Sequence, residues 1–282
     1  MSTLRIGFIG QGYVGKHSSD DMESRGHKVT RYALEAPYNE NKDKVKDCDI
    51  VFIAVPTPTT PGGFDSSIVE SVIPLTKPGA TIIFKSTLVP GTTRTLQKKY
   101  ADRVLFFSPE FLSEVTAAHD AAHPIMNVIG VTDPAHKEKA EQVMKILPES
   151  SHNQICSAEE AEIIKYAHNI HGFIRIIFSN LLYDLAQAHG ATWEAVKEGM
   201  DNDPFIGRTA TYTYTNPVHK SGRGAGGNCF LKDMAAFARH YREVVKDKEG
   251  GELLRAFEEK NLALLKASEK SLDIIKGIYG TK

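Results

Sequence analysis

The segment from Gly222 to Asp233 has the composition of a loop that presents a reactive thiol. It reads GRGAGGNCFLKD, so a glycine-rich stretch precedes Cys229, and Lys232 and Asp233 follow it. A cysteine that begins a helix is stabilised as thiolate by the first-turn amides and by a nearby lysine. Such a thiolate can form a covalent intermediate. The alternative is a small buried cysteine with a packing role, which is our interpretation of Cys48 and Cys156.

Two further pairs of polar residues stand four positions apart. Lys165 and Asn169 share one face of a predicted helix, where an ammonium and an amide could bind a substrate oxygen; a solvated helix face is the alternative. Glu110 and Glu114 follow a predicted strand, and ligands of open α/β sheets collect at that edge. A capping or salt-bridge role is the alternative for these two carboxylates.

A glycine motif near the N-terminus predicts a dinucleotide site. Gly10, Gly12 and Gly15 follow a predicted strand and begin a predicted helix, with Tyr13 and Val14 between the last two glycines. In this context the glycines allow a tight turn, close approach of a pyrophosphate and close packing of helix and strand.

The adenosine side of this site is less regular. An acid normally ends the second strand and binds the ribose hydroxyls, but this region reads TRYALE, with Arg31 near the strand end and Glu35 beyond it. Arg31 would favour the 2′-phosphate of NADP. If Arg31 is only a surface residue, Glu35 or a backbone group would bind the ribose of NAD. We expect NAD, with NADP not excluded.

The elements that position these residues alternate between apolar runs and helical segments. Strand-length apolar runs occupy 4–9, 28–32, 50–55, 81–84, 104–107 and 126–131, which is typical of strands buried on both faces of a parallel sheet. Ser157 and Glu160 form a capping-box pattern before a long helix predicted from about Ala158 to about His189. The second half of this helix is apolar on nearly every side, so we expect burial, in part by a second subunit.

The predicted fold class is α/β, with an N-terminal Rossmann-like doubly wound parallel sheet, a long central helix and a smaller all-α domain. The predicted domains are 1–156, which binds the dinucleotide, and 157–282, which is helical, mediates dimerisation and carries the cysteine loop. Two more helices are expected, from about Phe230 to Lys246 and from Glu252 to about Ile278.

Composition narrows the class of protein. The chain has 282 residues, 41% of them hydrophobic and 24% charged, and a formal net charge of -1, which is typical of a packed globular protein and does not suggest a nucleic-acid partner. There is no apolar run long enough to span a membrane and no secretory signal. The three scattered cysteines favour a reducing cytoplasm over a disulfide framework. No metal site is expected.

Taken in order along the chain, these motifs resemble the UDP-glucose/GDP-mannose dehydrogenase family. The resemblance spans about residues 4 to 245 and includes GQGYVG at 10–15, VPT at 55–57, FDSS at 64–67, KST at 85–87, SPEFL at 108–112 and the cysteine loop. The FDSS and His123–Pro124 segments are most similar to the UDP-glucose branch. The resemblance implies NAD-dependent oxidation of a nucleotide-sugar C6 alcohol to the uronic acid, through a thiohemiacetal and a thioester, by a homodimer formed through the long helix.

The resemblance also implies roles for individual residues. The catalytic residues would be Cys229 as nucleophile, Lys165 and Asn169 as oxyanion donors, Glu110 as base, and Asp233 and Thr87 as supporting groups. The cofactor would contact Gly10, Gly12, Tyr13, Val14, Gly15, Thr57 and Glu114. The substrate would contact Glu110, Phe111, Leu112, Lys165, Asn169 and Gly226.

The chain departs from the family pattern in four places. The chain stops at Lys282, where the family's C-terminal nucleotide-binding domain would begin, and the segment 33–48 looks short. The acid at the second strand is absent. An arginine that the family supplies across the dimer has no clean match, although Arg208 is near.

Two other functions stay open. One is a two-electron β-hydroxyacid-type dehydrogenase, which would have no use for a thiolate, and the other is a non-catalytic cofactor-binding subunit.

Overall fold

The computed structural model describes residues 4–207 and 214–280. The chain divides into two compact units. The first comprises Met1–Pro58 and Asp65–Lys165, and the second comprises Thr59–Phe64 and Tyr166–Lys282. The short segment Thr59–Phe64 is therefore an excursion from the first unit that packs with the second.

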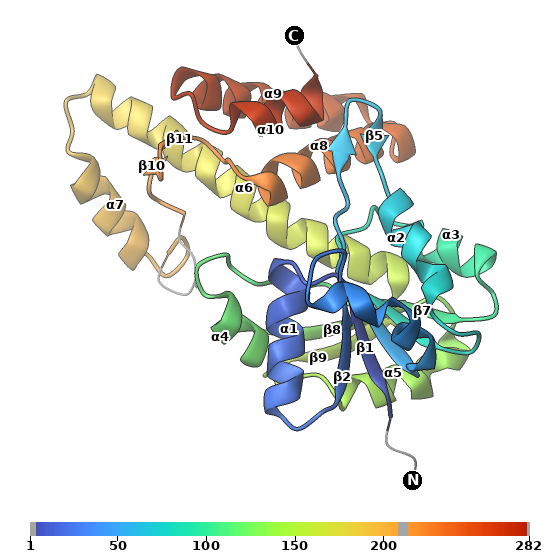
Figure 1. Ribbon diagram of the computed structural model, residues 1–282. Coiled ribbons are helices and arrows are strands. Elements are labelled where there is room, and N and C mark those ends of the chain that lie inside the picture. The colour runs from blue at the N-terminus through green and yellow to red at the C-terminus, as the bar shows by residue number, and fades with distance from the viewer. Residues whose placement is uncertain (1–3, 208–213, 281–282) are drawn as a thin grey trace. The chain divides into compact units, whose positions relative to one another are not determined.

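The first unit is built on a seven-stranded sheet with the order β2-β1-β3-β6-β7-β8-β9 (Figure 1). The strands are β1 (Ile6–Ile9), β2 (Val29–Tyr32), β3 (Ile50–Ile53), β6 (Thr81–Phe84), β7 (Val104–Phe107), β8 (Asn127–Val131) and β9 (Asn153–Ser157). Neighbouring strands are parallel except β7 and β8. The doubly wound sheet is confirmed, but it is only mainly parallel. The connection after β7 leads into β8 at the same end of the sheet, so β8 runs antiparallel to β7.

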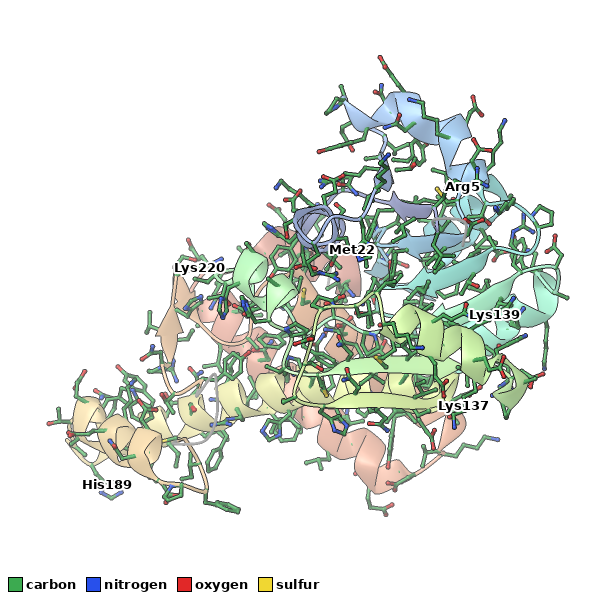
Figure 2. The ribbon with its side chains drawn as sticks, turned by 90° about the horizontal axis from the view of Figure 1, so that it is seen from below. Arg5, Met22, Lys137, Lys139, His189 and Lys220 are labelled. Carbon is green, nitrogen blue, oxygen red and sulfur yellow. The ribbon has the colours of Figure 1, made fainter. Side chains whose placement is uncertain are left out.

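The helical segments of the first unit are short. They are α1 (Tyr13–Ser24), η1 (Tyr38–Asp47), α2 (Ser67–Val72), η2 (Ile73–Leu75), α3 (Thr92–Lys99), α4 (Ala117–Ala122), η3 (Pro134–His136) and α5 (Lys137–Met144). The core beneath them includes Phe8 and Phe52, whose rings stack with centroids 4.7 Å apart. Met22 of α1 is buried in the same core (Figure 2). Of the strands predicted from apolar runs, β1, β3, β6, β7 and β8 are buried throughout, whereas the edge strand β2 is half-buried at Val29 and Thr30.

Helix α6 (Ala158–Ala188) begins in the first unit and ends in the second. Its start is the predicted capping box: the backbone N–H of Ser157 donates to Glu160 at 2.7 Å, and the N–H of Glu160 donates to Ser157 Oγ at 3.3 Å. Gly190, with φ of +64°, follows its end. The predicted bounds of this helix are confirmed.

The second unit is mainly helical. Its other elements are α7 (Trp193–Asn202), α8 (Asn228–Val244), α9 (Lys248–Ala267), α10 (Leu272–Tyr279) and two small strand pairs, β4 (Thr59–Thr60) with β5 (Gly63–Phe64) and β10 (Val218–His219) with β11 (Gly222–Arg223). The sequence predicted one final helix, but the structure has two. The chain turns between them, where Glu269 and Ser271 have φ of 52° and 59°. The helical character of the C-terminal region is confirmed, and within 157–282 the structure adds one short strand pair, β10 with β11.

Part of α6 carries an apolar face that its own chain leaves open. Phe173 and Ile177 are buried, whereas Phe178, Leu181 and Leu185 are 51%, 45% and 56% exposed. The chain itself therefore buries only part of this half of the helix, and the burial expected from a second subunit stays a prediction. Across residues 4–207 and 214–280, no helix combines the length and apolar character needed to cross a membrane.

Candidate functional site

The glycine turn after β1 forms a cradle for a dinucleotide. β1 lies between β2 and β3, so the connection after β1 and the connection before β3 run to opposite sides of β1. Ligands of open α/β sheets bind at such a topological switch point. Gly10 has φ of +92°, and a Cβ there would lie 2.3 Å from the carbonyl oxygen of Ala54. A Cβ on Gly15 would lie 1.9 Å from the carbonyl oxygen of Gly10. Both positions therefore require glycine.

Gly12 has a different reason to be glycine. It is the N-cap of α1, it is exposed, and a Cβ placed on it would meet nothing within 4 Å. The space in front of the first turn of α1 is thus left to a ligand, and a helix N-terminus attracts phosphate. Tyr13, which is exposed, and Val14, which is half-buried, begin the helix. The residues present fit the pyrophosphate of a dinucleotide.

Arg31 does not act as an open phosphate receptor. It is buried, and its guanidinium contacts Asp20 at 2.6 Å and Glu23 at 2.6 Å. Two carboxylates already neutralise the charge that would select the 2′-phosphate of NADP. Glu35, the alternative group for the ribose, is exposed in the turn after β2.

A chain of polar contacts lies where β6 and β7 end. Lys85 follows β6, is 7% exposed, and its ammonium contacts Glu110 Oε1 at 2.5 Å and donates to Ser108 Oγ at 3.1 Å. Lys165 of α6 donates to the backbone carbonyl of Glu110 at 2.5 Å. Glu110 is thus held twice, through its side chain by Lys85 and through its backbone by Lys165.

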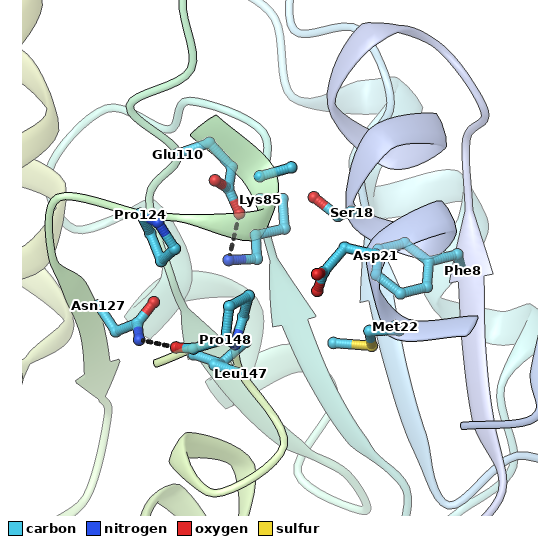
Figure 3. Close-up of a pocket in the computed structure, with 11 residues that line it drawn as sticks. Phe8, Ser18, Asp21, Met22, Lys85, Glu110, Pro124, Asn127, Leu147 and Pro148 are labelled. Atoms are coloured by element: carbon cyan, nitrogen blue, oxygen red, sulfur yellow. Dashed lines mark hydrogen bonds and ion pairs between the residues drawn. The ribbon is translucent and has the colours of Figure 1, made fainter. Parts of the chain in front are cut away.

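Figure 3 shows this contact at the wall of a pocket within the first unit. Lys85 and Glu110 line it from the segments that follow β6 and β7, and Ser18 and Asp21 line it from α1. Pro124 and Asn127 line it from just before β8 and from its first residue. The amide of Asn127 donates to the carbonyl of Pro148 at 2.7 Å. The carboxylate of Glu110 therefore borders a pocket whose lining is partly polar and partly apolar.

The other predicted site residues of the first unit differ in how far their side chains are exposed to solvent. Thr57 and Phe111 are buried, Thr87 and Leu112 are half-buried, and Glu114 is exposed. The Lys165 ammonium lies 5.6 Å from the centre of the Phe111 ring, which is a cation–π distance. The SPEFL segment therefore contacts Lys165 through both Glu110 and Phe111.

In the second unit, Asn169 and Asp233 form a buried pair. Asn169 of α6 donates to Asp233 Oδ2 at 2.5 Å, and the Lys232 ammonium contacts Asp233 Oδ1 at 2.6 Å. Both Asn169 and Asp233 are buried. Asp233 thus fixes the orientation of the amide one helical turn after Lys165.

Cys229 lies in the first turn of α8 and is exposed. The alternative of a buried packing cysteine therefore does not apply to it. Cys48 is buried, and Cys156 is half-buried with a thiol pKa that burial raises to about 11. Burial also raises the pKa of the Cys48 thiol, so these two thiols are poor nucleophiles near neutral pH.

Three residues that organise these groups, Lys85, Asn261 and Lys270, had no role predicted from the sequence. Lys85 could have been found, because it directly follows a strand adjacent to the one that ends before Glu110. Asn261 and Lys270 contact the glycine-rich loop before Cys229, and no local pattern marks them. Arg208 lies outside the described residues. Within the residues that the structure describes, no group of three or more His, Cys, Asp or Glu side chains could hold a metal ion.

Comparisons with known proteins agree with this architecture. Residues 33–147 match the NAD binding domain of the UDP-glucose/GDP-mannose dehydrogenase family, and residues 159–262 match its central domain. The Bacillus subtilis protein YtcA, named as a proposed UDP-glucose 6-dehydrogenase, is 32% identical over 83% of this chain and 62% of its own length. The chain thus spans less than two thirds of that relative.

Solved structures of related proteins have a similar fold. A UDP-glucose dehydrogenase from Pyrobaculum islandicum is similar with a TM-score of 0.76 and 26% identity, over 91% of this chain and 68% of that one. A 3-hydroxyisobutyrate dehydrogenase from Mycobacterium tuberculosis shares the fold alone, with a TM-score of 0.72, 15% identity and 98% coverage of both chains. The family-domain matches cover most of the chain and the cofactor of the matched N-terminal domain is NAD, so this chain belongs to the UDP-glucose/GDP-mannose dehydrogenase family.

Proposed function

We propose that this chain oxidises the C6 alcohol of a nucleotide sugar, most directly UDP-glucose, to the uronic acid. The observation that carries the proposal is Cys229, an exposed thiol in the first turn of α8. Oxidation of an alcohol to a carbonyl needs no thiol, whereas oxidation onward to an acid can use one to hold the aldehyde covalently.

In this proposal residues 1–156 bind the dinucleotide and residues 157–282 carry the cysteine loop. When bound, NAD would supply the hydride acceptor for each of the two oxidations. Gly10, Gly12, Tyr13, Val14 and Gly15 would bind its pyrophosphate. Thr57 and Glu114 contribute to the cofactor site, as the family resemblance implies.

The chain's own residues carry the remaining steps. In the first oxidation the C6 hydroxyl passes its proton to bulk solvent through a water that Thr87 orients, and the carbon loses hydride to leave an aldehyde. The Cys229 thiolate then adds to the aldehyde carbon, which forms a C–S bond and an oxyanion. Lys165 and Asn169 stabilise that oxyanion, with Asp233 orienting the amide.

The second oxidation removes hydride from the same carbon and turns the thiohemiacetal into a thioester. Glu110 takes a proton from a water that attacks the thioester carbonyl. The C–S bond breaks, Cys229 leaves as thiolate, and the carboxylate product forms. Phe111, Leu112 and Gly226 are proposed to contact the substrate, together with Glu110, Lys165 and Asn169.

The experiment that tests this function is the stoichiometry of cofactor reduction with UDP-glucose. We expect two NADH per sugar consumed, and far slower reduction of NADP because Arg31 is already paired with Asp20 and Glu23. The β-hydroxyacid alternative predicts one NADH per small hydroxy acid. A non-catalytic subunit predicts NAD binding with no reduction for any sugar.

We also propose that the chain forms a homodimer through α6. The support is the half-exposed apolar face of Phe178, Leu181 and Leu185, which lie three and four positions apart on one side of the helix. Leu181→Arg would place a charge in this face, and light scattering would then give the mass of one chain where the parent gives that of two. A monomeric parent would contradict the proposal.

A further inference from the structure

The loop that leads to Cys229 is held by a buried amide. The side chain of Asn261, on α9, accepts from the backbone N–H of Ala225 at 2.8 Å and donates to the carbonyl of the same residue at 3.0 Å. Asn261 is only 1% exposed. This two-way contact satisfies both backbone groups of Ala225, so it fixes the orientation of the loop at its middle.

A buried ammonium holds the loop on either side of Arg223. Lys270, in the turn between α9 and α10, donates to the carbonyls of Gly222 at 3.0 Å and Gly224 at 2.9 Å. It is 7% exposed, and burial lowers the pKa of its ammonium from the usual value. Lysine is rarely buried without partners, so its position here indicates that two carbonyls need a shared donor.

Two serines complete the contacts. The backbone N–H of Arg223 donates to Ser268 Oγ at 3.0 Å, and that of Gly227 donates to Ser271 Oγ at 3.3 Å. The Arg223 side chain in turn donates to Asn180 Oδ1 of α6 at 2.9 Å. Backbone groups from residue 222 to residue 227 are therefore bonded to side chains of α9 and of the turn that follows it.

The glycines of the loop are explained by the same side chains. A Cβ on Gly222 would lie 2.5 Å from Ser268 Cβ, and one on Gly226 would lie 2.8 Å from Lys270 Cε. Gly224 has φ of +88°, and its Cβ would lie 2.9 Å from Asn261 Oδ1. The backbone needs glycine here because α9 and its following turn approach it so closely.

We infer that Asn261 and Lys270 are positioning residues that clamp the loop 222–227 and thereby set where Cys229 enters the first turn of α8. This inference rests on the proposed function only in treating Cys229 as the nucleophile. Neither residue touches the reacting atoms. Their contribution is geometric, and a displacement of about 1 Å in a reacting group can slow a reaction about 100-fold.

The test compares Asn261→Ala and Lys270→Met with the parent chain. Hydrogen exchange followed by mass spectrometry on the 222–228 segment should be on the order of 10-fold faster in each variant, because local opening sets exchange. With UDP-glucose, kcat should fall roughly 10- to 100-fold, while KM for NAD should stay within about twofold because the clamp does not contact the cofactor. Lys266→Met, exposed on α9, is the matched control and should change neither value.

Asn261→Asp covers the case in which the alanine variant does not fold. A carboxylate still accepts from the Ala225 N–H but cannot donate to its carbonyl. The rise in exchange rate and the fall in kcat should therefore both lie between those of the parent and of Asn261→Ala. Unchanged exchange, or faster exchange with unchanged kcat, would overturn the clamp. A parent chain that reduces no NAD would contradict the proposed function instead, and the exchange comparison would then decide the clamp alone.

Discussion

The ammonium of Lys85 lies 2.5 Å from the carboxylate of Glu110, and both groups are mostly shielded from water, with side-chain exposures of 5% and 16%. The two residues stand 25 positions apart, but each follows the end of one of two adjacent parallel strands, β6 and β7. The sheet therefore pairs a cation with the carboxylate that we propose as the base for thioester hydrolysis.

The first prediction concerns this pair. Lys85→Met should lower the free energy of unfolding by about 3–5 kcal/mol, because it leaves a carboxylate buried without its partner. Denaturant titration measures the loss. Adding Glu110→Gln to Lys85→Met should recover part of the stability, since the unpaired charge is gone. Losses that simply add in the double variant would contradict a direct interaction.

The second prediction concerns Glu162, which is fully buried. Its carboxylate accepts from the N–H of Gly91 at 2.6 Å and from the N–H and Oγ of Thr93 at 2.9 and 2.6 Å, at the start of α3. Glu162→Gln replaces one accepting oxygen by a donor, so it should destabilise the fold by about 1–3 kcal/mol. Thermal and denaturant unfolding measure this, with the exposed Glu138→Gln as control.

The difference between parent and Glu162→Gln should also depend on pH. Burial raises the pKa of Glu162 from 4.5 to about 7, with the hydrogen bonds opposing that rise. Because the folded-state pKa lies above the unfolded value, the stability that this group gives the parent is complete below about pH 4.5 and is lost as the pH rises through about 7. The difference in free energy of unfolding between parent and Glu162→Gln should therefore decrease between about pH 4.5 and pH 7. A gap that widens with pH would mean that the donors favour the ionised form.

The third prediction concerns Lys165. Lys165→Ala should lower kcat with UDP-glucose by about 100-fold, the usual effect of losing one oxyanion donor, and leave the dissociation constant for NAD nearly unchanged. Steady-state kinetics and a separate NAD titration give the two values. The control is Lys139→Ala, an exposed lysine on α5 (Figure 2). A loss confined to NAD affinity at unchanged kcat would remove Lys165 from the oxyanion role.

Local patterns predicted much of the fold. The apolar runs that became β1, β3, β6 and β7 are buried in full, and the capping box at Ser157 and Glu160 begins α6 as expected. Strand β9 was missed because Asn153–Ser157 is mostly polar and lies at the edge of the sheet. Its pairing with β8 is a tertiary contact that no local pattern encodes.

The candidate site was predicted by residue type more than by arrangement. The sequence predicted Cys229, Lys165, Asn169 and Asp233 but not the pairing of Asn169 with Asp233, which depends on how α6 packs against α8. Lys270 carries no signal at all, since a lysine in a helical region is expected to face water. Its burial follows from the turn between α9 and α10, where neither glycine nor proline marks the break.

The most direct test of the central claim is the product formed by Cys229→Ser. We predict that this variant binds NAD as the parent does but forms no uronic acid from UDP-glucose, because a serine hydroxyl is a far weaker nucleophile than a thiolate. Cys156→Ser, which changes a half-buried thiol, should form acid at the parent's rate. Chromatographic measurement of the uronic acid, with NAD binding followed in parallel, gives both values. Equal acid formation by Cys229→Ser and the parent would contradict the assignment of Cys229 as nucleophile.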